Sequence, residues 1–261
     1  MSNCKTIAIC NQKGGVGKTT SSVNLADYLA RRKQKVLLID LDPQGNTSSS
    51  FGINKDDLKL TIYDSFINEK PLSEVIHKNV RKNLDIIPSN IDLAGAEIEM
   101  VKIVSRETIL KSLLTDEIKD SYDIILIDCA PSLGLLTVNA LTASNSLIIP
   151  IQAEYYALEG VSQLINTFNM VKDNLNPDLK IFGVLITMFD TRTQLSHQVA
   201  KEIETFFNDL VFKTKIPRNV RLSEAPSYGK PISEHDKWSK GARSYKALAK
   251  EVVDRIADQR A

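Results

Sequence analysis

A glycine-rich stretch near the amino terminus constrains the fold of this chain more than any other feature. The stretch NQKGGVGKTT (residues 11–20) follows the apolar run KTIAIC and precedes a helical pattern. Read back from Gly17-Lys18-Thr19, it matches the phosphate-binding pattern G-x-x-x-x-G-K-[ST] except at its first position, where Gln12 replaces glycine. A strand, a glycine-rich loop and a helix in this order predict a parallel sheet with a phosphate site at one edge.

Apolar runs alternate with helical patterns along all 261 residues. Six runs are apolar enough to be strands buried on both faces. They cover residues 5–10, 35–40, 84–88, 123–128, 146–151 and 180–188. Two stripes with helical spacing, over residues 158–175 and 245–256, are expected to be core faces. The pattern predicts a single α/β domain over residues 1–261, with a mostly parallel twisted β-sheet flanked by helices on both faces.

The composition, 43% hydrophobic and 25% charged, is that of an ordinary globular chain. No apolar run approaches the roughly 18 to 20 residues that a membrane span needs. The first residues enter a strand pattern without the basic and apolar regions of a secretion signal. The three cysteines have no paired or metal-type spacing, so we expect reduced core thiols in a cytoplasmic protein. They are Cys4, Cys10 and Cys129.

The net charge of +1 hides an uneven distribution. Residues 210–250 contain ten Lys and Arg against three Asp and Glu, a net +7, which leaves −6 for the rest of the chain. A local positive field in a nearly neutral chain indicates an anionic partner for one face. For any single lysine, a solvated helix surface is the simpler interpretation.

Three polar stretches follow the first, second and fourth predicted strands, and parallel strands bring such stretches to one sheet edge. They are residues 11–20, 40–46 and 128–131. Asp128 closes the apolar run DIILID and is placed to hold a metal ion through water. A lone glycine-rich loop could be a mere turn, but the strand, the helix and the distal Asp128 together predict a nucleoside-triphosphate site.

Each residue type in the loop has a chemical reason. Gly14, Gly15 and Gly17 let the backbone turn tightly and direct its N–H groups at phosphate oxygens, next to the positive end of the following helix. Lys18 supplies a point charge for the β- and γ-phosphates, and Thr19 supplies a hydroxyl for Mg²⁺.

Longer blocks of the sequence resemble one family. KGGVGKTT with DLDPQGN and DCAPS resembles the deviant-Walker subclass of P-loop NTPases, and the whole chain resembles its ParA/Soj chromosome-partitioning branch. The matching blocks, in order, are NQKGGVGKTT, VLLIDLDPQGN, QAEYYALEGV, TMFDTRT and IPRNVRLSEAPSYGKPI. Ala130, where the branch often has proline, is a small departure with no expected functional consequence. The resemblance implies a slow, Mg²⁺-dependent ATPase.

The resemblance also implies roles for single residues. Two subunits would sandwich two nucleotides, and Lys13 of each would reach the other's triphosphate, comparable in kind to an arginine finger. Asp42 would position the attacking water, although Asp-Pro is also a common turn pair. Thr19, Asp40 and Asp128 would form the metal shell, and Lys13, Lys18 and Asp42 would be catalytic. The implied ATP contacts are Lys13, Gly14, Gly15, Val16, Gly17, Lys18, Thr19, Thr20, Glu154, Met188, Pro217 and Asn219.

At the level of the whole protein, the resemblance implies an ATP-dependent homodimer that binds double-stranded DNA without sequence preference. A ParB-like centromere-binding partner would accelerate hydrolysis and release the dimer, which would be cytoplasmic and nucleoid-associated. The branch places DNA-contacting arginines where this chain has Arg192, Arg218 and Arg221, and each could instead be an ordinary salt-bridge residue. The nature of the cargo, chromosome or plasmid, and any contact with a replication initiator stay open.

Two other functions remain as alternatives. A membrane-associated relative resembling MinD would need a terminal amphipathic helix with bulky apolar residues and a basic face, whereas this chain ends in EVVDRIADQRA. A nitrogenase-reductase-like redox enzyme would need two cysteines at the dimer face, and only Cys129 is expected near that edge. The three histidines show no ligand spacing. They are His77, His197 and His235.

Overall fold

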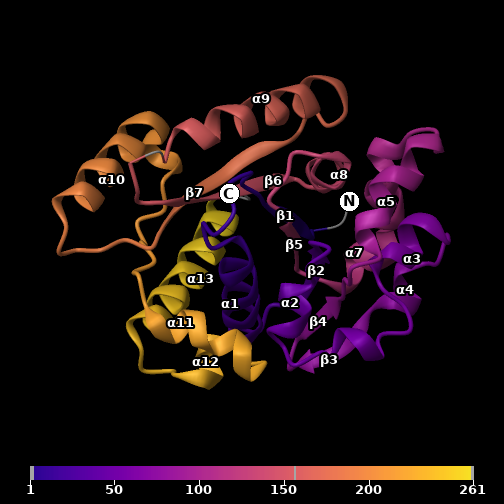
Figure 1. Ribbon diagram of the computed structural model, residues 1–261, viewed down its shortest axis with the longest axis horizontal. Coiled ribbons are helices and arrows are strands. Elements are labelled where there is room, and N and C mark those ends of the chain that lie inside the picture. Colours follow the sequence, from indigo (N-terminus) through magenta and orange to yellow (C-terminus); the bar gives the residue numbers. More distant parts are fainter. Residues whose placement is uncertain (1–2, 156, 260–261) are drawn as a thin grey trace.

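A seven-stranded sheet runs through the computed structural model, which describes residues 3–155 and 157–259 (Figure 1). The strand order is β3-β4-β2-β5-β1-β6-β7, and every pairing except that of β3 with β4 is parallel. The strands are β1 (Lys5–Ile9), β2 (Val36–Leu41), β3 (His77–Arg81), β4 (Leu84–Ile87), β5 (Ile124–Cys129), β6 (Ser146–Gln152) and β7 (Lys180–Thr187). All six predicted strands are present, which confirms the predicted fold class.

The edge strand β3 was not predicted. It pairs antiparallel with β4, with a register shift between His77 and Arg81. Its sequence, HKNVR, contains one apolar residue and none of its residues is fully buried. A strand that buries no face carries no hydrophobic period, so sequence patterning does not detect it.

Helices cover both faces of the sheet (Figure 1). One face packs against α1 (Lys18–Arg31), α11 (Val220–Glu224), α12 (Ile232–His235) and α13 (Lys240–Asp258). The helices that pack on the other face are α3 (Ile62–Ile67), α4 (Leu72–Val75), α5 (Leu93–Glu99), α6 (Ile109–Leu113), α7 (Asp116–Ser121), α8 (Leu135–Ala143), α9 (Glu159–Asn174) and α10 (Gln194–Phe207). The short α2 (Asn46–Ser49) follows β2. Both predicted helical stripes, on α9 and α13, contribute buried side chains to these cores.

Parallel pairing brings the carboxyl ends of β1, β2, β5, β6 and β7 to one edge of the sheet. The register sets Asp128 beside Ile9 on one side and beside Asp40 on the other. The glycine-rich loop and the two aspartates therefore meet at one edge, as predicted. Within the described part of the chain, none of the helices is both long and apolar enough to span a membrane.

Candidate nucleotide-binding site

The loop between β1 and α1 has the backbone shape of a phosphate cradle. Gly15 and Gly17 have φ angles of 74° and 87°, in the left-handed region where a side chain is strained. Gly17 is also the N-cap of α1, so the loop leads directly into the positive end of that helix. The Lys18 ammonium folds back across the loop and donates to the Lys13 carbonyl at 3.1 Å. The Lys18 side chain therefore bridges the two sides of the loop, and the same ammonium is the one expected to contact phosphate.

Two side chains that sequence analysis missed hold this loop to the sheet. Asn11 is buried, donates through Nδ2 to the Pro150 carbonyl at 2.7 Å, and accepts from the Lys13 N–H at 3.0 Å. Thr187, at the end of β7, donates to the Val16 carbonyl at 2.8 Å. Asn11 lies just after β1, and a polar amide at the end of a buried strand is the sequence feature that could have indicated this anchoring role.

Asp128 is fully buried and is surrounded by hydroxyl groups. Its two carboxylate oxygens accept from Thr19 Oγ1 at 2.8 Å, Ser22 Oγ at 2.8 Å and Thr47 Oγ1 at 2.7 Å. Burial raises the pKa of Asp128, and the three hydroxyl donors oppose that rise. The contact with Thr19 joins two of the three predicted metal-shell residues.

Asp40 lies beside Asp128 and is equally buried. It accepts from the Ser48 N–H at 3.0 Å, from Ser48 Oγ at 2.8 Å and from the Asp42 N–H at 3.2 Å. Burial, and then the neighbouring charge of Asp128, raise the pKa of Asp40 to about 7. Two adjacent buried carboxylates are unfavourable unless a cation or a proton shares their charge.

These groups fit Mg²⁺ bound together with phosphate. Mg²⁺ takes hard oxygen ligands and usually completes its shell with water and substrate phosphates, rather than with a full protein cage. Thr19 and the two aspartates offer such oxygens, whereas the described residues contain no group of three or more His, Cys, Asp and Glu that could hold a metal ion by themselves. Burial lowers the pKa of Lys18, and Asp128 opposes this effect.

Asp42 forms a turn, as the Asp-Pro pair in the sequence allowed. Its Oδ1 accepts from the Gln44 N–H at 2.9 Å and its carbonyl accepts from the Gly45 N–H at 2.8 Å. The side chain is 7% exposed and sits directly after β2 at the cradle edge. A turn residue at this position can also face a reacting group, so its catalytic role stays a prediction.

A cavity of about 250 Å³ lies beside the loop and collects the residues predicted to contact the base. Met188, Pro217 and Asn219 line it together with Gly17 and Thr20 of the cradle. Tyr245 of α13 also lines it, and sequence analysis assigned that residue only to the core. A partly open slot next to a phosphate cradle suits a flat heterocyclic ring.

Lys13 and Glu154 lie on the rim of the site. The Lys13 Nζ is 3.9 Å from Glu154 Oε2, and the Lys13 side chain is 38% exposed. The same carboxylate accepts from Arg218 Nη2 at 3.3 Å and from the Gln152 amide. The Lys13 ammonium therefore lies on the outer side of the loop, as predicted, while its contact across a dimer stays a prediction.

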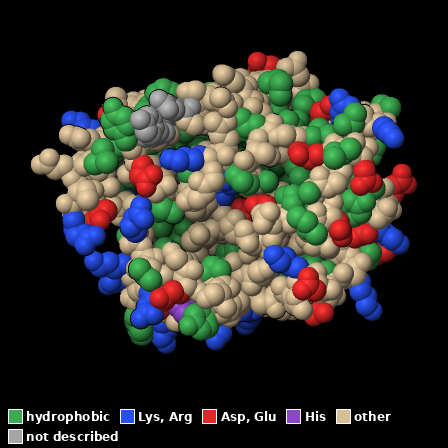
Figure 2. Space-filling model, in the orientation of Figure 1, with side chains coloured by type: hydrophobic (Ala, Val, Ile, Leu, Met, Phe, Trp, Pro, Cys, Tyr) green, Lys and Arg blue, Asp and Glu red, His purple; other side chains and the backbone are tan. Residues whose placement is uncertain are grey.

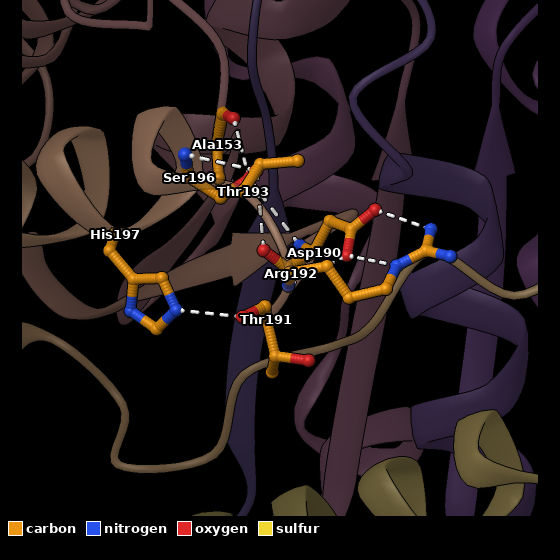
Figure 3. A network of polar contacts seen from close by, with 7 residues as sticks. All are labelled: Ala153, Asp190, Thr191, Arg192, Thr193, Ser196 and His197. Atoms are coloured by element: carbon orange, nitrogen blue, oxygen red, sulfur yellow. Dashed lines mark hydrogen bonds and ion pairs between the residues drawn. The ribbon is translucent and has the colours of Figure 1, made fainter.

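The three predicted DNA-contacting arginines all have acidic neighbours. Arg192 donates two hydrogen bonds to Asp190, from Nε to Oδ1 at 2.9 Å and from Nη2 to Oδ2 at 2.7 Å (Figure 3). Its hydrogen bonds hold the pKa of Asp190 well below the usual range. Arg221 lies 2.9 Å from Glu224 and 3.7 Å from an Asp236 oxygen. The salt-bridge interpretation of each arginine therefore remains open beside the DNA interpretation.

One expectation about cysteine was wrong. Cys129 was expected to be the only cysteine near this edge, but the pairing of β1 with β5 sets Cys10 beside it, with 2.6 Å between the two Sγ atoms. Both thiols are buried in the core, so neither reaches the surface of the protein. Burial, and then Cys10, raise the pKa of Cys129 well above its usual range, as expected of an inert core thiol.

Comparison with known proteins agrees with this site. A family model described as an AAA domain matches residues 4–181. The sporulation initiation inhibitor protein Soj of Bacillus subtilis is 57% identical over 95% of this chain and 98% of its own length. The chromosome-partitioning ATPase Soj of Treponema pallidum is 51% identical over 96% of this chain and 98% of its own length.

A solved structure has the same fold with nucleotide and metal bound. Cobyrinic acid a,c-diamide synthase from Mycobacterium smegmatis, with bound ATP analogue and magnesium, has a TM-score of 0.85 and 34% identity over 98% of this chain and 97% of its own. The 57% identity to Soj over 95% of this chain, with the cradle and the two strand-end aspartates in place, shows that this chain belongs to the ParA/Soj family of chromosome-partitioning ATPases, which act on ATP with Mg²⁺.

Proposed function

We propose that this protein partitions DNA by cycling between an ATP-bound dimer on DNA and an ADP-bound monomer off it. The observation that carries the proposal is the Thr19–Asp128 contact of 2.8 Å next to the Lys18 side chain, at the mouth of a glycine cradle. Mg²⁺, held by Thr19 with Asp40 and Asp128 behind it, would neutralise charge on the β- and γ-phosphates.

The roles of the protein's own residues follow from their positions. The N–H groups of residues 14–20 and the Lys18 ammonium would bind the phosphates, and the slot lined by Met188, Pro217 and Asn219 would take the adenine. Asp42, held by its turn at the rim of the cradle, would orient the attacking water. Catalysis of phosphoryl transfer consists largely of such positioning and charge stabilisation.

Dimerisation would complete the site. Lys13 would leave Glu154 and contact the triphosphate of the partner subunit, supplying charge in trans. An ammonium 38% exposed and paired at 3.9 Å gives up little on leaving that contact. Residues 1–261 would act as one ATPase domain in this arrangement.

The dimer would then bind DNA through Arg192, Arg218 and Arg221, without reading sequence, because phosphate contacts carry no sequence information. Two protomers double the number of such contacts and steepen the dependence of affinity on salt. A ParB-like partner would accelerate hydrolysis and release the dimer, which gives a nucleoid-associated protein. The membrane alternative predicts ATP-dependent sedimentation with anionic vesicles, and we expect none.

The deciding experiment is size-exclusion chromatography with light scattering, in ADP and in ATP. The wild type should be a monomer in ADP, and Asp42→Ala should accumulate as a dimer in ATP because hydrolysis no longer releases it. Asp56→Ala, at an exposed acid in the short 3-10 helix Lys55–Asp57, is the matched control and should behave as wild type. An Asp42→Ala protein that binds ATP yet stays monomeric would refute the proposed cycle.

A further inference from the structure

A cationic hollow lies away from the nucleotide edge, between the carboxyl end of α1, the β3–β4 turn and the segment joining α12 to α13. Its volume is about 900 Å³, and its lining carries seven Lys and Arg against two acids, Asp27 and Glu234. We call it the basic groove. Its cations are Arg31, Arg32, Lys33, Arg81, Lys82, Lys237 and Lys246.

The two acids of the groove are already engaged. Asp27 accepts from Arg31 Nε at 2.8 Å, and Glu234 pairs with Arg81 at 2.6 Å and with Arg31 at 3.6 Å. The other cations form no ion pair with any residue that the structure describes, and all are exposed. These unpaired cations are Arg32, Lys33, Lys82, Lys237 and Lys246. The groove therefore presents uncompensated positive charge to solvent.

Trp238 adds an aromatic surface to this charge. It is the only tryptophan in the chain and it is 78% exposed. The Lys237 Nζ lies 5.3 Å from the centroid of its ring. An exposed indole beside cations that form no ion pair suits the backbone of a nucleic acid, because the cations can bind phosphates and the ring can pack on a sugar.

The groove borders Arg221, one of the three arginines predicted to contact DNA. Asp236 lies 3.7 Å from Arg221 and accepts from the Trp238 N–H at 3.1 Å, so one carboxylate links Arg221 to the groove. On the face drawn in Figure 2, Lys and Arg side chains gather at the lower left over α11 and α12, whereas Asp and Glu are more frequent on the right over α3 to α5. The positive region thus extends along one side of the molecule.

From this link we infer that the basic groove is a second contact for the DNA backbone, extending the footprint from Arg221 past Trp238 to the end of α1. The inference rests on the proposed function, since it assigns further surface to the same ligand. An acidic polypeptide would satisfy the charge alone, but the exposed indole and the junction with Arg221 favour the nucleic acid.

Trp238 makes the groove directly observable, because excitation at the long-wavelength edge of the absorption band selects this one tryptophan over the seven tyrosines. In ATP, a short mixed-sequence DNA duplex should reduce the quenching of Trp238 by iodide, and added salt should restore it. Polyglutamate serves as the competing probe. Protection by polyglutamate with none by duplex would overturn the inference and assign the groove to an acidic protein partner.

A charge-matched pair of variants measures the contribution to affinity. One carries Arg32→Gln, Lys33→Gln and Lys82→Gln in the groove, and its control carries three exposed lysines changed to glutamine elsewhere. The control positions are Lys111, Lys172 and Lys180. Each lost phosphate contact reduces the salt slope by about 0.9, so the groove variant should lose about 2.7 from the slope for each groove that contacts the duplex, and it should bind at least tenfold more weakly at moderate salt. The control should change less than twofold.

The outcomes separate the two proposals. A groove variant that binds like its control, while Arg221→Ala weakens binding, overturns the groove and leaves the proposed function intact. A wild type that does not bind duplex in ATP overturns both. All six positions are exposed, and circular dichroism checks that both variants keep the native fold.

Discussion

Asn11 offers a sharp test of how the phosphate cradle is held in place. Its amide is buried between β1 and β6 and makes two hydrogen bonds, one to the Pro150 carbonyl at 2.7 Å and one from the Lys13 N–H at 3.0 Å. Asn11→Ala removes both bonds and leaves two backbone groups without their partner. A typical net loss is about 1 kcal/mol per bond, with more for a buried partner left unsatisfied, so we expect a loss of about 2 to 3 kcal/mol in the free energy of unfolding.

For a chain of this size, each kcal/mol shifts Tm by about 2 to 4 °C, so the expected fall is about 5 to 10 °C. Calorimetry without nucleotide gives this value, and binding of a fluorescent ATP analogue should weaken as well, because the loop backbone loses its anchor. Asn46→Ala, at another asparagine of the same edge, is the comparison. If Asn11→Ala costs less than about 0.5 kcal/mol, the size of an ordinary surface change, the anchoring argument is wrong.

Three further predictions test other parts of the site. Lys13→Ala should abolish hydrolysis while nucleotide binding persists in equilibrium dialysis, because the cradle keeps its other groups. Tyr245→Phe removes the 3.0 Å contact with Ser21 Oγ but keeps the ring in the core, so urea unfolding should show a loss of about 1 kcal/mol. Arg192→Ala should raise the pKa of Asp190, since the hydrogen bonds from the arginine hold that pKa low. NMR titration of the Asp190 carboxyl measures this pKa, and an unchanged value in the variant would contradict the prediction.

The parts of the fold with a strong hydrophobic period were predictable from sequence. Each buried parallel strand is a continuous apolar run, and the helices on either side repeat every three or four residues, so local patterning suffices. Strand β3 lacks such a period because it lies at the edge of the sheet. It was found only through its pairing with β4.

Site residues that belong to one sequence motif could be predicted. Contacts between residues from separate segments could not. The cradle and Asp128 lie in recognisable local patterns. The hydroxyls of Ser22 and Thr47 reach Asp128 from two other segments, and the neighbourhood of Cys10 and Cys129 depends on which strands are adjacent. Strand order sets these contacts, and no single stretch of sequence encodes it.

The Glu154 carboxylate forms ion pairs with two cations, Lys13 at 3.9 Å and Arg218 at 3.3 Å. All three side chains are more than a third exposed, so each attraction is worth at most about 1 kcal/mol. A buried ion pair in this place would resist separation far more strongly. Because these ion pairs are long and exposed, either Lys13 or Arg218 can leave Glu154 for another anion at little cost in free energy. Once one cation has left, Glu154 can pair more closely with the other.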